Sequence, residues 1–224
     1  MDWRYNTIWA EQLPTAEYAA VNFNNRSESP QSLAGKRYIS AAKFKSKSEN
    51  LLDFPTIGGV DYLYIGSSNI KSFSGLSRFG DVKRLEAQYC LKLESESGLA
   101  DLRNSLEWLH INQSKKFTPG EELFSLKKLR VLCLNVCGPL QDLEFLYSFP
   151  DLLDFRFVDT NILSGDLTPL IRHPTLCSAG FMNKRHYNLK DTEVDEHLRQ
   201  RWHAAIEKAY KGNYETYKYA ALGT

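Results

Sequence analysis

The sequence has no uninterrupted apolar stretch approaching the ~20 residues that a membrane-spanning helix needs. Residues 1–6 are followed by no apolar run behind a basic segment, so no secretory signal is visible. Only four cysteines occur, and their spacing shows no paired disulfide framework. Reduced thiols are the default in a chain without an export signal. We therefore expect a cytoplasmic protein, bacterial in character, with no membrane partner.

An excess of charge of one sign is also missing. Lys and Arg total 28, Asp and Glu total 27, and the formal net charge is +1. Nucleic acids and anionic membranes attract proteins through basic surfaces. The total charge therefore favours neither as a partner.

Catalytic and cofactor signatures are absent as well. The chain has no Gly-x-Ser-x-Gly elbow, no phosphate-binding loop of the Gly-Lys-Ser/Thr type and no Gly-x-Gly-x-x-Gly. His197 and His203 are six residues apart, which places them on different faces of a helix and not in a zinc-binding pair. We expect no enzyme activity, no cofactor and no metal. An enzyme with an unrecognised site remains an alternative.

What the sequence does contain is one apolar pattern that recurs six times. The pattern is apolar-x-x-apolar-x-apolar, and successive copies begin 22, 24, 23, 23 and 24 residues apart. The copies begin at Val60, Val82, Leu106, Leu129, Leu152 and Leu176. Of the 18 apolar positions, 16 hold a large apolar side chain, although the chain is only 42% hydrophobic. Positions four and six point to one face of a strand, so each copy predicts a short buried strand.

This pattern resembles the leucine-rich repeat, whose units of ~20–29 residues follow Leu-x-x-Leu-x-Leu-x-x-Asn/Cys-x-Leu. Cys90 and Cys137 occupy the Asn/Cys position, which is position nine of the repeat. The other units have Ser68, Ser114, Thr160 and Lys184 there. The resemblance covers roughly residues 60–184. It implies stacked repeats, and the departures at position nine imply irregular turns with imperfect hydrogen bonding.

The second half of each repeat carries another apolar pair, three residues apart, which suits a helical or 3₁₀ turn. The pairs are Leu76 and Phe79, Leu99 and Leu102, Leu123 and Leu126, Leu143 and Leu146, and Leu167 and Leu170. The predicted fold class is therefore α/β: a leucine-rich repeat solenoid with a curved parallel β-sheet, about six repeats, capped at both ends. An ordinary doubly wound domain is the alternative, but its βαβ units usually need about 30 residues or more.

We expect three parts: an N-terminal segment and cap at 1–59, the solenoid at 60–189, and a C-terminal amphipathic helix and tail at 190–224. Residues 1–37 show no clear period, whereas Tyr38–Phe44 fits a degenerate strand. Near the C-terminus, apolar residues recur every four positions, which predicts a helix that ends before Gly212. These residues are Val194, Leu198, Trp202, Ile206 and Tyr210. The helix either caps the last repeat or binds a partner.

The candidate site is the face of the sheet opposite the core. If positions four and six point inward, positions three and five point to the concave side. We expect the partner-binding residues to be Tyr62, Tyr64, Arg84, Glu86, Trp108, His110, Asp154 and Arg156. Val131, Cys133, Ser178 and Gly180 share these positions, whereas Cys137 points into a turn, so Cys133 and Cys137 form no zinc pair. Aromatics and Arg anchor many interfaces, and Trp108 is the expected exposed centre. Strand propensity alone is the competing explanation for them.

These features predict a non-enzymatic protein-binding module with one protein partner. Residues 181–188 are similar to the terminal repeat of small bacterial leucine-rich proteins, some of which are immunity proteins that neutralise a toxin. The most concrete prediction is therefore an immunity protein that binds and blocks a cognate bacterial toxin. The alternative is an adaptor or substrate-recognition subunit of a larger assembly. The oligomeric state is not predicted.

Overall fold

The computed structural model describes residues 4–8, 14–25, 30–211 and 214–219. Its main feature is an eight-stranded sheet in which every neighbouring pair is parallel and the strands follow one another in sequence order. The strands are β1 (Tyr18–Asn22), β2 (Tyr38–Ala42), β3 (Tyr62–Gly66), β4 (Arg84–Gln88), β5 (Trp108–Ser114), β6 (Val131–Cys137), β7 (Asp154–Arg156) and β8 (Ser178–Gly180). The α/β class and the six predicted strands are confirmed. β2 matches the degenerate strand, whereas β1 was not predicted.

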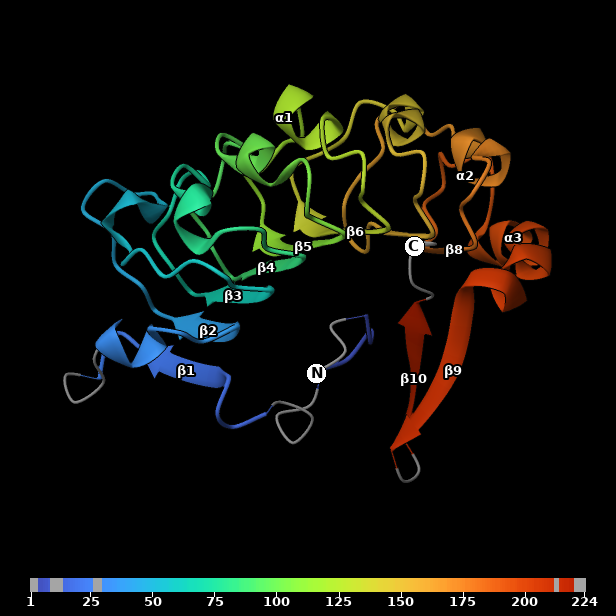
Figure 1. Cartoon of the computed structure of the whole chain (residues 1–224). Coiled ribbons are helices and arrows are strands. Elements are labelled where there is room, and N and C mark those ends of the chain that lie inside the picture. The colour runs from blue at the N-terminus through green and yellow to red at the C-terminus, as the bar shows by residue number, and fades with distance from the viewer. Residues whose placement is uncertain (1–3, 9–13, 26–29, 212–213, 220–224) are drawn as a thin grey trace.

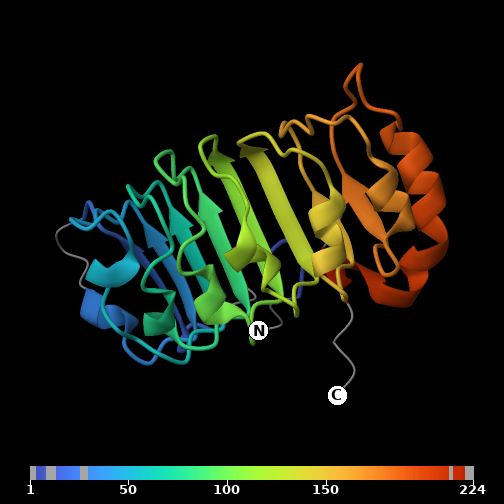
Figure 2. The ribbon, with the colours of Figure 1, turned by 90° about the horizontal axis from the view of Figure 1, so that it is seen from above.

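The segments that return from one strand to the next are short helical turns on the outer side of the arch (Figures 1 and 2). They are η2 (Pro30–Leu33), η3 (Leu51–Asp53), η4 (Leu76–Phe79), η5 (Leu99–Leu102), α1 (Glu121–Phe124), η6 (Glu144–Ser148) and α2 (Thr168–Arg172). The predicted apolar pairs fall in or beside these turns and are all buried. A parallel sheet on the inner side and stacked turns on the outer side are compatible with a repeat solenoid.

The core lies between these two layers. Of the 18 apolar positions in the six repeats, 17 are buried and Ala179 is half-buried. They belong to a single apolar cluster that runs from Val21 near one end to Leu198 near the other. Each repeat therefore completes the core of its neighbours, as the constant period predicts.

The turns after strands β2 to β7 share a repeated backbone conformation. Six non-glycine residues at position eight of successive repeats have φ between 52° and 59°, in the left-handed region. They are Lys43, Ser67, Tyr89, Gln113, Val136 and Asp159. A β-branched residue such as Val136 is strained there because its side chain crowds the backbone.

The position after it links neighbouring repeats. Thr160 Oγ1 donates to the carbonyl of Leu134 at 2.7 Å, and the Cys137 thiol lies 3.6 Å from the carbonyl of Ile111. Equivalent contacts to the preceding repeat come from Ser68, Cys90 and Ser114. Ser and Thr hydroxyls thus stand where the pattern has Asn or Cys, whereas Cys90 and Cys137 fit the pattern and make longer thiol contacts.

Two carboxylates link adjacent repeats by hydrogen bonds on the outer side. Glu96 accepts the backbone N–H groups of Gly120, Glu122 and Leu123 at the start of α1, at 2.6 to 3.1 Å. In return, Glu122 accepts N–H groups at the start of the preceding turn η5, at 2.8 and 3.1 Å. Each carboxylate therefore satisfies backbone donors of the neighbouring repeat that the short turn leaves without an internal partner.

The C-terminal region differs from the prediction. α3 (Asp191–Ala205) is shorter than expected, and β9 (Ile206–Lys211) follows it at once and pairs with β10 (Tyr214–Tyr219) in an antiparallel hairpin. The period of four through Ile206 was wrong as a helix signal because pairing with Tyr219 and burial against the sheet select a strand there. The side chains of Trp202 and Tyr210, and Gly212, lie outside the described residues.

α3 packs on the last strand of the sheet. Val194 and Leu198 are each 1% exposed and belong to the main core, so this helix closes the C-terminal end. At the other end, β1 and β2 extend the sheet into the segment that was expected to be a cap. Among the described residues, no helix has the length and apolar character of a membrane span.

A concave face covered by the chain termini

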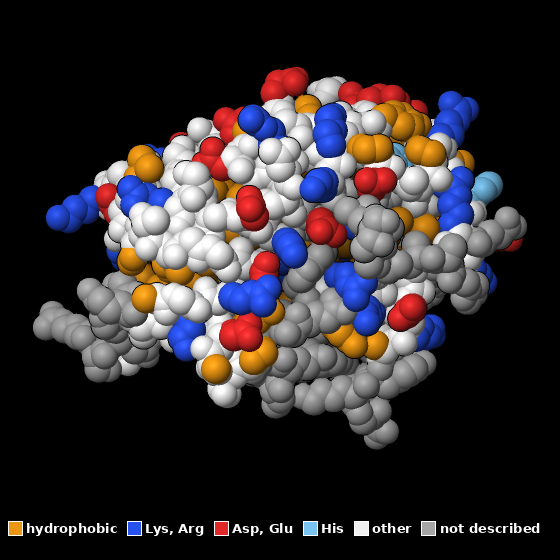
Figure 3. Space-filling view, viewed as in Figure 1, with side chains coloured by type: hydrophobic (Ala, Val, Ile, Leu, Met, Phe, Trp, Pro, Cys, Tyr) orange, Lys and Arg blue, Asp and Glu red, His pale blue; other side chains and the backbone are white. Residues whose placement is uncertain are grey.

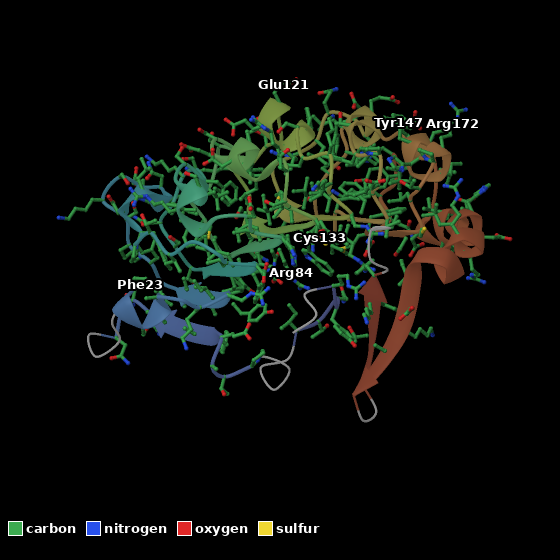
Figure 4. The ribbon with its side chains drawn as sticks, in the orientation of Figure 1. Phe23, Arg84, Glu121, Cys133, Tyr147 and Arg172 are labelled. Carbon is green, nitrogen blue, oxygen red and sulfur yellow. The ribbon has the colours of Figure 1, made fainter. Side chains whose placement is uncertain are left out.

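The side chains opposite the core lie in rows on the concave face of the sheet. Strand register places Tyr38, Tyr62, Arg84, Trp108, Val131, Asp154 and Ser178 in a first row. The second row is Ser40, Tyr64, Glu86, His110, Cys133, Arg156 and Gly180. All eight predicted site residues stand in these two rows, and Arg84 and Cys133 are labelled on this side in Figure 4. A third row, which the prediction missed, contains Gln88, Asn112 and Asn135.

Two terminal segments lie beneath this face, and together we call them the terminal cover: residues 4–8 and the β9–β10 hairpin (Figure 1). They are joined to each other, because Asn6 N donates to Tyr217 O at 2.7 Å and Tyr219 N donates to Arg4 O at 3.1 Å. Five of the predicted residues are buried: Tyr62, Arg84, Glu86, Trp108 and Asp154. Three are half-buried: Tyr64, His110 and Arg156.

Trp108 shows the effect of the terminal cover most clearly. Its side chain is 2% exposed. The Arg84 guanidinium lies 3.8 Å from the indole centroid, and the ring of Tyr219 packs edge-on at 5.2 Å. The prediction that Trp108 is exposed was wrong, because Tyr219, from the segment expected to be a tail after the helix, lies over it.

Arg84 connects the sheet to the N-terminal part of the terminal cover. Its guanidinium donates to the backbone carbonyls of Tyr5 and Asn6, the latter at 3.2 Å. Its Nε also donates to Glu86 Oε1 at 2.7 Å. Burial by itself raises the pKa of Glu86, but Arg84 and His110 outweigh burial and the pKa is lowered. Glu86 is therefore an anion, and it orients the Arg84 guanidinium toward the N-terminal segment.

A chain of amide side chains and an imidazole spans the second and third rows. Asn135 Nδ2 lies 3.1 Å from His110 Nε2, and the Gln88 amide lies 3.1 Å from His110 Nδ1. Asn135 is oriented by Val158 N, which donates to its Oδ1 at 2.9 Å, so its Nδ2 donates to the imidazole. An imidazole that accepts a hydrogen bond is neutral. Burial lowers the pKa of His110 in the same direction, and the nearby Glu86 only partly opposes it.

The hairpin part of the terminal cover is held at Asp154, which is 0% exposed. Asp154 Oδ2 accepts from the Tyr219 hydroxyl and from Arg156 Nε, the latter at 2.9 Å. Asp154 raises the pKa of Arg156, and burial followed by Asp154 raises the pKa of Tyr219. Two buried atoms here have no hydrogen-bond partner among the described residues: Asp154 Oδ1 and Trp108 Nε1.

Sequence reasoning missed Tyr38, Tyr219 and the third row. Tyr38 lies 24 residues before Tyr62, which is one repeat earlier, so the period could have found it. Tyr219 carried no such signal because its contact with the sheet is made by a segment distant in sequence. Acidic and basic side chains are interspersed on the side of the molecule seen in Figure 3, as the balanced composition predicts.

The thiols are placed as the repeat frame predicts. Cys133 lies on the covered concave face, whereas Cys137 is the last residue of β6 and lies in the main core, where burial raises its pKa to about 12. Across the described ranges, no three His, Cys, Asp or Glu side chains gather in a way that could hold a metal ion. A scan against protein-family models and a search of curated protein sequences gave no match to this chain.

Proposed function

We propose that this chain is a non-enzymatic protein-binding module whose concave sheet face holds one protein partner. The observation that supports this most directly is that the face already binds polypeptide, namely the chain's own ends. Arg84 donates to two backbone carbonyls of residues 5 and 6, and Trp108 packs against the ring of Tyr219. Buried Arg and Trp side chains that engage main chain and aromatic groups are typical anchors of protein interfaces.

The repeat type that we propose is the leucine-rich repeat. The repeat length of 22 to 24 residues, the parallel strand in each repeat and the Ser, Thr or Cys ladder at position nine all support it. A stacked array of this kind presents a rigid, preformed surface. Such a surface loses little conformational entropy on docking, so a few well-placed anchors can give tight binding.

In its most concrete form, the proposal is a cytoplasmic bacterial immunity protein that blocks the active site of a cognate toxin by occlusion. The similarity of residues 181–188 to small bacterial leucine-rich proteins supports this form. A nucleic acid or membrane partner is not part of the proposal, because the net charge is +1 and both signs are mixed on the surface.

The second candidate is an adaptor or substrate-recognition subunit that docks through its N-terminal segment or C-terminal helix. α3 uses Val194 and Leu198 to close the core, and residues 4–8 hold the hairpin. These internal contacts occupy the segments that an adaptor would offer, so they favour the concave-face module.

Capture from the native host tests the proposal. Tagged full-length protein should co-purify with one protein partner, identified by mass spectrometry. Tyr64→Ala alters the half-buried part of the face, and Tyr147→Ala is a matched control on the outer side, where Tyr147 is 45% exposed. A loss of ~2 kcal/mol at a hot spot corresponds to roughly 30-fold weaker binding.

We expect that loss for Tyr64→Ala and none for Tyr147→Ala. Equal capture by wild type and Tyr64→Ala, with loss in Tyr147→Ala, would move the binding surface to the outer side. A partner that is recovered through residues 1–37 or 190–212 would favour the adaptor.

A further inference from the structure

The terminal cover forms a second apolar cluster that is separate from the main core. On the sheet side it contains Trp108, Val131, Cys133, Leu153 and Cys177. On the hairpin side it contains Ile206, Tyr217 and Tyr219. The main core lies on the other face of the same strands and contains none of these residues. Lifting the hairpin would therefore leave the contacts of the main core in place.

The hairpin leaves unpartnered polar atoms and an unfilled pocket where it packs on the sheet. Trp108 Nε1 and Asp154 Oδ1 are buried without a hydrogen-bond partner among the described residues. A polar atom buried without a partner destabilises the closed arrangement. A pocket of about 190 Å³ also remains between the sheet and the hairpin, lined by residues that include Arg156, Ser178 and Tyr217.

Among the described residues, α3 joins the hairpin covalently to the anchored part of the fold. β9 begins directly after α3, whose Val194 and Leu198 are fixed in the core. The N-terminal segment is tied to the hairpin through Asn6 and Tyr217. Rotation near Ala205 and Ile206 would thus carry the hairpin away from the face while α3 stays in place.

We propose that the terminal cover is displaceable and that the face beneath it is the docking surface for an extended segment of the protein partner. This inference rests on the proposed protein-binding function. The segment presents an aromatic ring to Trp108, as Tyr219 does, together with a hydrogen-bond donor to Asp154. The partner segment binds the face more favourably than the chain's own hairpin does, because it also supplies an acceptor to Trp108 Nε1 and a donor to Asp154 Oδ1. Its binding is opposed by the high effective concentration of the tethered hairpin.

The four native cysteines allow opening to be measured without a partner. Cys133 lies under the terminal cover, whereas Cys90 and Cys137 lie in the main core. The full-length protein is incubated with a thiol-alkylating reagent, and each site is followed by peptide mass spectrometry. Burial raises the pKa of the Cys133 thiol, so this thiol reacts only after it becomes solvated. We expect Cys133 to react well before Cys90 and Cys137.

Tyr219→Ala weakens closure because it removes the ring against Trp108 and the hydroxyl at Asp154. It should accelerate labelling of Cys133 at least ~10-fold, an effect that corresponds to about 1.4 kcal/mol, and leave Cys90 and Cys137 unchanged. Tyr219→Phe keeps the ring and should give an intermediate rate, and Tyr147→Ala should have no effect. If all native cysteines react together at the rate of global unfolding, the terminal cover is not displaceable and the inference is wrong.

A synthetic peptide tests docking itself. The peptide Tyr-Glu-Thr-Tyr-Lys-Tyr, with the sequence of residues 214–219, is added at millimolar concentration to the Tyr219→Ala protein. We expect it to slow labelling of Cys133, and the same peptide ending in Ala should not. Rapid labelling that neither peptide slows would overturn the docking surface. Neither result affects capture of a partner from the native host, so failure here is distinguishable from failure of the proposed function.

Discussion

Replacing Trp108 by Ala tests whether this residue is an exposed binding residue or a buried structural one. The indole is 2% exposed and lies between the Arg84 guanidinium and the Tyr219 ring. An aromatic side chain buries ~150–250 Å², worth roughly 4–6 kcal/mol at ~25 cal/mol per Å². Loss of a desolvated cation–π contact adds ~2 kcal/mol. The substitution also removes the unpartnered Nε1 and its desolvation penalty, which offsets ~1–3 kcal/mol of this loss.

The balance is roughly 3–7 kcal/mol, so we expect Trp108→Ala to lower the free energy of unfolding by at least ~3 kcal/mol, the lower end of the range for truncating a buried aromatic. Trp108→Phe keeps an aromatic ring and removes the unpartnered donor, so we expect a change within ~1 kcal/mol. Urea denaturation followed by far-UV circular dichroism gives both values by linear extrapolation. A loss below about 1 kcal/mol for Trp108→Ala would mean that the ring is exposed in solution, and the buried cluster would be refuted.

Four further predictions concern the repeats. Leu132→Ala and Leu109→Ala should each cost ~2–5 kcal/mol in denaturant melts, and losses below about 1 kcal/mol at both would show a misplaced repeat frame. Val136→Asn should raise stability by ~1 kcal/mol, because Asn tolerates the left-handed backbone at φ 52°; a loss would contradict the strain. Glu122→Ala should cost ~1–2 kcal/mol through two lost backbone contacts, and Glu122→Gln should cost less. His110, with its pKa lowered by burial, stabilises the fold fully above pH ~6.5 and loses this contribution as pH falls below that value, so His110→Gln should flatten the acid side of the stability curve.

The repeat strands could be predicted because their signal is local and repeated. Leu109 and Leu132 occupy the same frame position in neighbouring repeats, and a one-residue shift would turn the whole apolar set to the other face. Register and parallel order follow from that constraint. β1 had no comparable signal, because its sequence Tyr-Ala-Ala-Val-Asn places only Val21 in the fully buried set.

The terminal hairpin could not be predicted from spacing alone. Ile206 continues a period of four that starts in α3, and in the strand that it begins, Ile-Glu-Lys-Ala-Tyr-Lys, only Ile and Tyr are strong β-formers. The choice depends on contacts with Tyr219 and with the sheet face, which are distant in sequence. This error carried over to the site prediction: the eight residues lie on the expected face, but their exposure depends on both parts of the terminal cover.

One signal of the terminal cover was nevertheless present in β6. A strand that buries one face alternates apolar and polar residues, whereas a strand buried on both faces is apolar throughout. Residues 131–134 read Val-Leu-Cys-Leu, without alternation, and all four are buried. In β4, by contrast, Arg84 and Glu86 alternate with Leu85, and Arg84 donates to the backbone of residues 5 and 6. The apolar residues of the face thus lie under the hairpin together with Asp154 and Arg156, whereas Arg84 lies against the N-terminal segment. A partner that binds the concave face must therefore use the half-buried second and third rows or replace the hairpin over β5, β6 and β7, and the labelling of Cys133 distinguishes these two modes.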